Sequence, residues 1–293
     1  MDRRMADPAA VGAIGAGDHA CLTFSDQEER LDLVAAFVRG GLRAGHKVVC
    51  WTDSVSPDEL TGELHDRAVR PGSALRRGQL RISTAADSLL GGAHDAASMV
   101  ETLTGEVRQA GREGYPGLRI TADMCWATRP LTSAEQLLEF ETRVTDLFAH
   151  GQLCLICQYD RERFDAVTLA FAARAHPKTV AAQVYLEHPL LRICRQYSPG
   201  GVRIAGELDF RHADVLELAL AESLRIDRHV RVNLAALDYI DGACAAIIVA
   251  AARSLPKSRR MTVTCRRLVG TVLSLVGADG VAALRVQRCH DQP

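Results

Sequence analysis

Glycine–lysine pairs are absent from the sequence, and lysine itself is scarce, with Lys47, Lys178 and Lys257 standing against 32 arginines. A phosphate-binding loop needs a G-x-x-x-x-G-K-[ST] run, in which backbone amides and the lysine surround the phosphates. The glycine-containing segment 12–17 is followed by Asp18, which places a negative charge where that lysine would stand. ATP hydrolysis through a phosphate loop is therefore not expected.

Long apolar runs and an excess of charge are also absent. No stretch approaches the ~20 consecutive apolar residues of a membrane-spanning helix, and residues 1–17 hold no apolar core typical of a signal peptide. The formal net charge is −1 without a basic block, so neither nucleic acid nor a membrane surface is an expected partner. We expect a cytoplasmic protein.

Disulfide bonds are not expected either. Nine cysteines is an odd number, and thiols stay reduced in the cytoplasm. Cys154 and Cys157 have a C-x-x-C spacing, but they fall in a segment that we predict as a strand, where residues three apart point to opposite faces. The pair is thus not expected to chelate one ion, and buried cysteine is a common core residue.

What the sequence does contain, from residue 19 to about 186, is a regular alternation of strand-like and helix-like segments. Ser25 and Glu28 have the spacing of a capping box at a helix start. Ser56 and Pro57 mark another start, with proline in the first turn, where its missing N–H costs nothing. Such alternation indicates crossover connections and a mostly parallel sheet covered on both faces. The prediction is an α/β fold.

The length favours two domains rather than one core. The alternation breaks at residues 187–201, which contain Pro189 and the run Ser198-Pro199-Gly200-Gly201. We predict an N-terminal domain over residues 1–186, a linker over residues 187–201, and a smaller α/β domain over residues 202–293.

Three segments within residues 203–286 carry a resemblance to the STAS family of anti-sigma-factor antagonists. Gly206-Glu207-Leu208-Asp209 resembles the G-E-L-D turn of that family. Residues 232–244 resemble its strand, loop and helix start, and residues 268–277 resemble its terminal helix. The order of these segments makes the match specific, and it implies a STAS-type domain that binds a protein partner.

The phosphoacceptor serine of that family is missing from this chain. The family has D-S-S-G at the helix start, with the second serine as acceptor, whereas Asp241 is followed here by Gly242, Ala243 and Cys244. Alanine has no hydroxyl, so Ala243 cannot be phosphorylated. The resemblance implies a partner-binding surface that is constitutive or controlled by the N-terminal domain, and a degenerate dimerisation or docking module is the alternative. The residues that the resemblance assigns to this partner-binding surface are Asp209, Asp241, Gly242, Ala243 and Cys244.

Residues 17–186 resemble the MEDS sensory domain of bacterial regulators that respond to small organic compounds. The resemblance implies a RecA/KaiC-like parallel-sheet sandwich, here without a phosphate loop, and a small-molecule ligand of unknown identity. The matching segments span nearly the whole domain and comprise residues 17–21, 41–45, 118–120, 124–126, 140–141, 157–160 and 175–177.

Several polar or soft side chains of this domain could converge at strand ends, where open α/β sheets bind their ligands. A redox-sensing pair of Cys21 with Cys125 or Cys157 is one option, and histidine with several cysteines also raises a metal or haem site. The spacing supports neither, so we predict no metal and no cofactor. The candidate ligand- or redox-sensing residues are His19, Cys21, Cys125, Trp126, Glu141, Cys157 and Tyr159.

The leading hypothesis is a cytoplasmic two-domain regulator without catalytic activity. Its N-terminal domain senses a small molecule or redox state, and its STAS domain passes the signal to an anti-sigma factor of the GHKL-kinase type or another regulatory protein. A homodimer is compatible with both domains. The alternatives are a degenerate RecA-like nucleotide-binding or thiol-dependent enzyme with a regulatory tail, and a structural scaffold.

Overall fold

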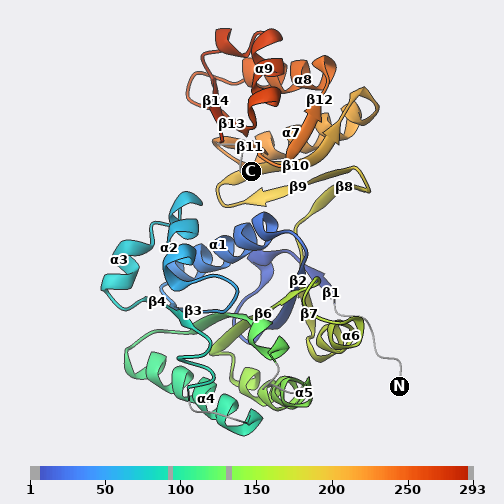
Figure 1. Cartoon of the computed structure of the whole chain (residues 1–293). Helices are drawn as coiled ribbons and strands as arrows, with labels where there is room; N and C mark the ends of the chain where they lie inside the picture. The colour runs from blue at the N-terminus through green and yellow to red at the C-terminus, as the bar shows by residue number, and fades with distance from the viewer. Residues whose placement is uncertain (1–6, 92–94, 130–133, 290–293) are drawn as a thin grey trace. The chain divides into compact units, whose positions relative to one another are not determined.

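The computed structural model describes residues 7–91, 95–129 and 134–289. The chain divides into two compact units, Met1–Ala181 and Ala182–Pro293, and each unit has its own seven-stranded sheet (Figure 1). None of the helices in these described ranges is long and apolar enough to cross a bilayer.

The sheet of the first unit is entirely parallel, with the strand order β1-β7-β2-β6-β5-β3-β4. Strands that are all parallel need crossover connections, and the helices between them supply these connections. This arrangement confirms the predicted fold class. The strands are β1 (Asp7–Ala9), β2 (His19–Phe24), β3 (Lys47–Thr52), β4 (Leu80–Thr84), β5 (Leu118–Asp123), β6 (Leu153–Asp160) and β7 (Lys178–Val180).

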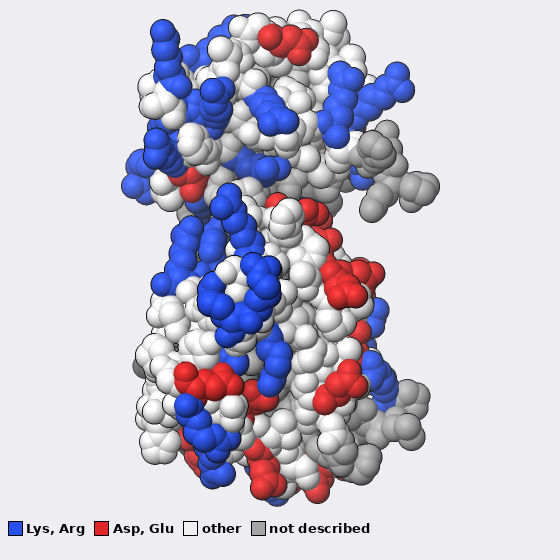
Figure 2. All heavy atoms as spheres, turned by 90° about the vertical axis from the view of Figure 1, so that its left-hand side faces the viewer, with Lys and Arg blue, Asp and Glu red and all other residues white. Residues whose placement is uncertain are grey.

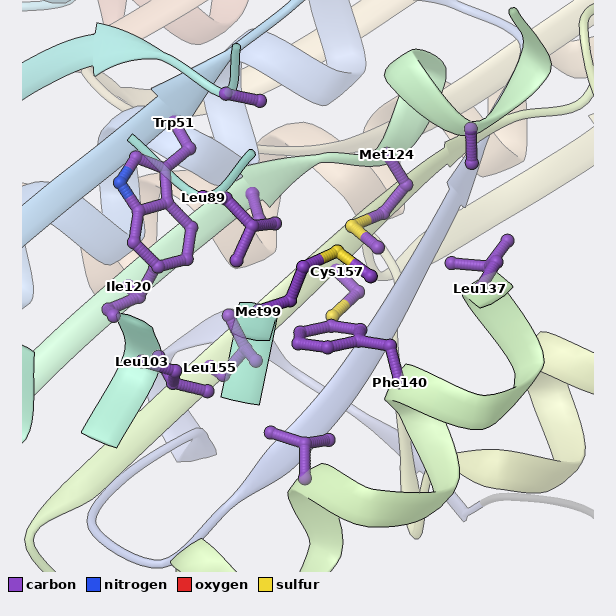
Figure 3. Close-up of a cluster of buried hydrophobic side chains, with 14 of the residues drawn as sticks. Trp51, Leu89, Met99, Leu103, Ile120, Met124, Leu137, Phe140, Leu155 and Cys157 are labelled. Carbon is purple, nitrogen blue, oxygen red and sulfur yellow. The ribbon is translucent and has the colours of Figure 1, made fainter. Parts of the chain in front are cut away.

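Helices cover both faces of this sheet (Figure 1). One face packs against α1 (Gln27–Arg43), α2 (Pro57–Asp66) and α3 (Pro71–Arg76) through a smaller apolar core. The other face packs against α4 (Ala96–Arg112), α5 (Ala134–Arg143) and α6 (Ala166–Ala175) through the larger core, part of which Figure 3 shows. Short 3-10 helices complete the unit, namely η1 (Val11–Ala13), η2 (Met124–Thr128) and η3 (Val144–His150).

The central strand β6 supplies side chains to both of these cores. Because side chains alternate along a strand, Cys157 and Tyr159 point toward α4–α6, whereas Cys154 and Gln158 point toward α1. Cys157 lies near Met124 and Phe140 (Figure 3). The two cysteines of the C-x-x-C spacing are therefore on opposite faces, as predicted.

One of the two predicted helix starts is shifted by a residue. The N-cap of α1 is Asp26, whose carboxylate accepts a hydrogen bond of 3.0 Å from the amide of Glu29, so Ser25 forms no capping box with Glu28. Aspartate is as good an N-cap as serine, and both residues have glutamate three positions later. At α2, Ser56 is the N-cap and forms a complete capping box with Glu59.

The second unit has a mixed sheet with the order β14-β13-β11-β10-β9-β8, and β12 pairs with β10. Its helices are α7 (Ala213–Ile226), α8 (Gly242–Arg253) and α9 (Arg267–Leu275), with the short η4 (Phe210–His212) and η5 (Ala278–Gly280). The strands are β8 (Val184–His188), β9 (Leu191–Tyr197), β10 (Gly200–Leu208), β11 (Val230–Leu234), β12 (Leu237–Ile240), β13 (Met261–Cys265) and β14 (Leu284–Arg288).

Residues 187–201, predicted as a linker, belong to this second sheet instead. Strand β9 pairs antiparallel with β8 and with β10, and Leu191 and Ile193 are buried in the core. Pro189 lies in the turn between β8 and β9, and Pro199 lies in the turn between β9 and β10. Proline and glycine therefore mark hairpin turns here. The predicted N-terminal domain of residues 1–186 also ends too late, because β7 belongs to the first unit and β8 to the second.

Candidate functional site

Four side chains with metal- or proton-binding atoms meet inside the first unit, on the α4–α6 side of the sheet. His19 begins β2, Cys157 lies in β6, Glu141 lies in α5, and His176 directly follows α6. All four are buried, and their ligand atoms lie within 4.8 Å of one another. We call this group the His–Glu–Cys cluster.

The parallel pairing of β2 with β6 brings two of these residues together. Cys21 and Cys157 are register partners, so the alternating side chains of His19 and Cys21 share a face with those of Cys157 and Tyr159. Helix α6 ends at Ala175, and the imidazole of His176 turns back to the carbonyl of Ala172. Each residue thus reaches the cluster from a different element.

The distances within the cluster are those of direct contact. The Oε2 atom of Glu141 lies 3.2 Å from Nε2 of His19 and 3.3 Å from Nε2 of His176. The Sγ atom of Cys157 lies 3.5 Å from Nε2 of His19. The other carboxylate oxygen of Glu141, Oε1, accepts a hydrogen bond from the hydroxyl of Tyr159.

Packing fixes the orientation of the two imidazole rings. The ring of His19 stacks on Phe148 with a centroid separation of 4.6 Å and an interplanar angle of 9°. The ring of His176 lies 4.0 Å from that of His19, and its Nδ1 is 2.7 Å from the carbonyl oxygen of Ala172. A carbonyl only accepts hydrogen bonds, so Nδ1 carries the proton and Nε2 of a neutral His176 keeps its lone pair.

The buried position shifts the pKa values of these groups. Burial disfavours the Glu141 carboxylate, but His176, His19 and the Tyr159 hydroxyl outweigh it and hold the pKa at about 2. Burial, reinforced by His19, lowers the pKa of His176 to about 4. Burial and the charge of Glu141 raise the pKa of Cys157 and that of Tyr159 well above their usual values.

The structure brings together four of the seven residues that we predicted as sensing residues, namely His19, Glu141, Cys157 and Tyr159. Cys21 lies beside Cys157, and burial raises the pKa of its thiol to about 12. Cys125 and Trp126 are instead in η2, beyond the carboxyl end of β5, and lie outside the cluster. All nine cysteines are free thiols.

Sequence reasoning missed His176 as a member of the cluster. The residue is fully buried beside Glu141, 35 positions further along the chain. The one signal for it was the segment 175–177, which was among those that match the MEDS family.

A second buried polar network lies on the opposite face of the same sheet. Asp123 ends β5, and its Oδ2 accepts a 2.7 Å hydrogen bond from the guanidinium of Arg30 and a 2.9 Å bond from the amide of Ser54. Nε of Arg30 donates to Gln158, which in turn donates to Thr121. Burial raises the pKa of Asp123, but the Arg30 charge and the Ser54 hydrogen bonds outweigh it and hold the pKa at about 2. We call this group the Arg–Asp network.

Arginines also gather on the surface of the first unit. Figure 2 shows positive side chains over the region of α1–α3, where a shallow pocket is lined by Arg39, Arg43, Arg70 and Arg77. Arg70 has φ +56°, a left-handed conformation at the start of α3. These arginines are dispersed in the sequence, so the sequence contains no basic block from which the positive surface could be predicted.

The predicted partner-binding residues surround the start of α8 in the second unit. Asp241 is the N-cap of α8, with Oδ1 accepting a 2.8 Å hydrogen bond from the amide of Cys244. Its Oδ2 accepts a 2.7 Å bond from the amide of Phe210, which joins the G-E-L-D turn to the helix. Gly242 and Ala243 are exposed. Cys244, which follows them, is fully buried, so its side chain offers no exposed surface to a partner.

The G-E-L-D turn has a conformation that requires glycine. Gly206 has φ +100°, and a Cβ there would lie 2.1 Å from the carbonyl oxygen of Leu190. Beside this turn, Asp209 pairs with Arg211, while Phe210 is 68% exposed and Tyr239 is 48% exposed. Charged and apolar side chains thus form one exposed surface next to Asp241.

The chain thus has an enclosed cluster of polar side chains in its parallel α/β unit and an exposed surface around Asp241 in its mixed α/β unit. Comparison with protein families agrees with this division. Residues 18–177 match the family described as MEthanogen/methylotroph, DcmR Sensory domain (MEDS), and residues 192–286 match the family described as Mlab, STAS domain. The chain therefore belongs to the MEDS family and carries a STAS domain after its sensory domain, which confirms both resemblances.

A curated relative and two solved structures are similar to parts of the chain. The transcriptional repressor DcmR of Methylorubrum extorquens (strain DSM 6343 / CIP 106787 / DM4) is 27% identical over 165 residues, which is 55% of this chain and 59% of that protein. The chain thus matches less than two thirds of the length of DcmR. The family descriptions and this relative identify a regulatory protein with a sensory domain.

The structural similarities are weaker. The flagellar accessory protein FlaH from Methanocaldococcus jannaschii has a TM-score of 0.45 at 10% identity, covering 64% of this chain and 83% of that one. The KaiC-like protein PH0186 from Pyrococcus horikoshii OT3 has a TM-score of 0.47 at 11% identity, covering 70% and 89%.

Proposed function

We propose that the protein is a non-catalytic regulator in which the sensory domain controls the binding of a protein partner to the STAS domain. The observation that carries this proposal is the exposed start of α8, where Ala243 stands without a hydroxyl beside the N-cap Asp241. Phosphorylation would add about −1.5 to −2 charges at such a position. Because this chain cannot receive that charge at Ala243, the usual phosphate control is lost there, and we infer that the sensory domain supplies the control instead.

The partner contacts the surface formed by Asp209, Phe210, Tyr239 and the start of α8. Exposed aromatic side chains beside charged ones are typical of binding surfaces, because the rings contribute most of the buried apolar area. Asp241 holds the G-E-L-D turn and the helix start together through its two hydrogen bonds. The partner that we propose is an anti-sigma factor of the GHKL-kinase type, and a second copy of the chain is the alternative occupant.

The input is a small molecule or a redox change in the sensory domain, and its output is a change in transcription. DcmR, which shares part of the sensory domain, is named a transcriptional repressor, and this supports a role in regulating genes. The His–Glu–Cys cluster brings together three buried polar atoms that have no hydrogen bond from the described residues, namely Nδ1 of His19, Oε2 of Glu141 and Nε2 of His176, and we infer that an input acts there.

Two observations argue against an enzyme. At the carboxyl end of β5, the Arg–Asp network is closed on itself, with Asp123 bound by Arg30 and Ser54. Burial raises the pKa of Cys21, Cys50, Cys125 and Cys154 to about 12, so the reactive thiolate is scarce at neutral pH. Neither the Arg–Asp network nor these four thiols therefore supplies a prepared group for nucleotide hydrolysis or thiol catalysis.

Co-purification of the tagged full-length chain from its native host tests the partner surface. Phe210→Asp is the test variant, and Leu218→Asp is the matched control, because Leu218 is 61% exposed on α7 of the same domain. We expect the wild type and Leu218→Asp to retain an anti-sigma factor and Phe210→Asp to lose it by more than tenfold. Equal retention by both variants contradicts the proposed surface.

Restoring the hydroxyl tests the proposed loss of phosphate control. Incubated with the kinase that co-purifies, Ala243→Ser should gain one phosphate and release its partner, while the wild type should gain none, as mass spectrometry would show. Phosphate on Ser254 of the wild type contradicts the proposal. ATP turnover by the wild type that Asp123→Asn abolishes would contradict the absence of catalysis.

A further inference from the structure

We propose that His19, Glu141, Cys157 and His176 bind one divalent transition-metal ion of the zinc type inside the sensory domain. The inference concerns the core of this domain alone and does not depend on which partner the STAS domain binds. It assigns a ligand to residues that the fold brings together from β2, α5, β6 and the end of α6.

The spacing of the four ligand atoms is that of a tetrahedral site. Two nitrogen or oxygen ligands about 2.0–2.1 Å from an ion lie about 3.3–3.4 Å apart at the tetrahedral angle, and nitrogen with a thiolate at about 2.3 Å lies about 3.6 Å apart. The corresponding distances here are 3.2 and 3.3 Å from Glu141 to the two histidines and 3.5 Å from Cys157 to His19. The remaining pairs are within 4.8 Å, so small side-chain rotations close the site.

Two of these atoms lack a hydrogen bond although they are fully enclosed. Among the described residues, Oε2 of Glu141 and Nε2 of His176 face each other at 3.3 Å without a hydrogen bond of regular geometry, and Oε2 also lies 3.2 Å from Nε2 of His19. Buried polar atoms are almost always satisfied, so each exception calls for a partner that the protein chain does not provide. A cation between them satisfies the carboxylate oxygen and the imidazole lone pair at once.

The surrounding hydrogen bonds orient the ligands as they do in metal sites. The backbone carbonyl of Ala172 accepts from Nδ1 of His176, which leaves Nε2 for the ion. The hydroxyl of Tyr159 donates to Oε1 of Glu141, which leaves Oε2 for the ion. The ring of His19 differs, since its Nδ1 has no hydrogen bond within the described part of the chain. Stacking on Phe148 orients this ring instead.

The donor set indicates the class of metal. Two imidazoles, a thiolate and a carboxylate suit Zn²⁺ and similar borderline ions, whereas Mg²⁺ and Ca²⁺ need sites built from oxygen atoms. The four ligands approach a single point from four elements, which leaves no plane for a porphyrin, so the haem option does not fit. With four protein ligands and no open position, the ion stabilises the domain rather than activating water.

Metal analysis of the full-length chain tests this inference. We expect the purified protein to contain about one zinc ion per chain after dialysis against metal-free buffer. Protein refolded with Co²⁺ should show the strong visible absorption of tetrahedral cobalt and a near-ultraviolet thiolate-to-cobalt band. Cys157→Ser should lose the thiolate band, and Cys154→Ser, three residues away on the other face of β6, should retain it.

A second measurement keeps the test decisive if a ligand variant does not fold. The wild type and Cys154→Ser should both melt at a lower temperature after treatment with a strong chelator and recover when Zn²⁺ is returned. Full-length protein that is folded, holds far less than one ion per chain, and gives no tetrahedral cobalt spectrum overturns the inference. A thiolate band that Cys154→Ser loses as completely as Cys157→Ser does overturns it as well.

Discussion

Two carboxylates are enclosed on opposite faces of the same parallel sheet, and they are satisfied in different ways. Asp123 of the Arg–Asp network binds a permanent cation, Arg30, and accepts further hydrogen bonds from the amides of Ser54 and Cys125. Glu141 of the His–Glu–Cys cluster is surrounded by two histidines, a thiol and a phenol. None of these four groups carries a permanent charge.

This difference separates a structural site from a site that accepts a ligand. The Arg–Asp network contains both charges and closes on itself, so it connects α1 to the ends of β5 and β6 without outside help. The His–Glu–Cys cluster holds a carboxylate with one oxygen that no hydrogen bond from a described residue satisfies. Three predictions test this contrast. Their stability measurements all use chelator-treated protein, so that the cluster is compared without an ion, and only the last prediction adds Zn²⁺ back.

Asp123→Asn should have the largest effect on stability. It leaves the guanidinium of Arg30 buried without an anion, and breaking a buried pair in this way costs about 3–5 kcal/mol in free energy of unfolding. Glu141→Gln should cost less, about 1–2 kcal/mol, because it leaves no permanently charged side chain buried without a partner. Urea unfolding followed by tryptophan fluorescence measures both losses in the first domain alone, since Trp51 and Trp126 are the only tryptophans.

The double variant Arg30→Met with Asp123→Asn is the control for that prediction. Removing the guanidinium as well removes the unpaired charge, so the double variant should be more stable than Asp123→Asn alone. If Asp123→Asn and Glu141→Gln lowered the free energy of unfolding equally, the proposed difference between the two carboxylates would be contradicted.

His176 should lose its contribution to stability in a higher pH range than the two buried carboxylates, because Glu141 and Asp123 both have a folded pKa of about 2. His176 has a folded pKa of about 4 against an ordinary value of 6.5, so the unfolded chain takes up the proton first. Stability from this residue is complete above about pH 6.5 and decreases as the pH falls toward 4, by about 3 kcal/mol. Asp123, with a folded pKa of about 2, contributes above about pH 4 and loses about 2 kcal/mol only as the pH falls from there toward 2.

Urea unfolding at a series of pH values between 7 and 3 measures these losses. His176→Gln should flatten the decrease between pH 6.5 and 4 while leaving the more acidic decrease in place. A wild-type stability that stays constant down to pH 4 would contradict the pKa assigned to His176.

Tyr159→Phe should have the smallest effect of the three. It removes the hydrogen bond to Oε1 of Glu141 and should lower the free energy of unfolding by about 1–2 kcal/mol. In the presence of Zn²⁺ it should weaken metal binding by about 10–100-fold, as the loss of a supporting hydrogen bond usually does. Competition with a zinc-binding dye measures the affinity, and an unchanged affinity would place Tyr159 outside the metal site.

The fold was largely predictable because the parallel sheet depends on a repeated local pattern. Strand-like and helix-like segments alternated regularly, and Ser56 with Glu59 marked a helix start that the structure contains. The linker prediction failed because proline is common both in hairpin turns and in linkers. Pro189 and Pro199 therefore do not by themselves distinguish the two. Only the apolar residues of β9, such as Leu191 and Ile193, distinguish the two cases, and these need the neighbouring strands to reveal their role.

The site was predictable only in part. The residues predicted for sensing included four that meet in the structure, namely His19, Glu141, Cys157 and Tyr159. His176 was not predicted, because its neighbouring sequence indicates only the end of a helix. Its role depends on α6 ending beside α5 and β2, which no pattern near residue 176 indicates. Cys125 was selected for its chemistry, but its position after β5 places it in η2, with its amide bound to Asp123.

The amino-acid sequence by itself determined what chemistry is absent. Ala243 has no hydroxyl and the chain has no glycine–lysine pair, and such facts hold in any conformation because they are properties of single residues and neighbours. Only the tertiary structure decided what the remaining groups do together. The pairing of β2 with β6 and the packing of α5 and α6 bring the ligand atoms of His19, Glu141, Cys157 and His176 within 4.8 Å of one another, because burying the apolar faces of these elements also encloses their few polar side chains.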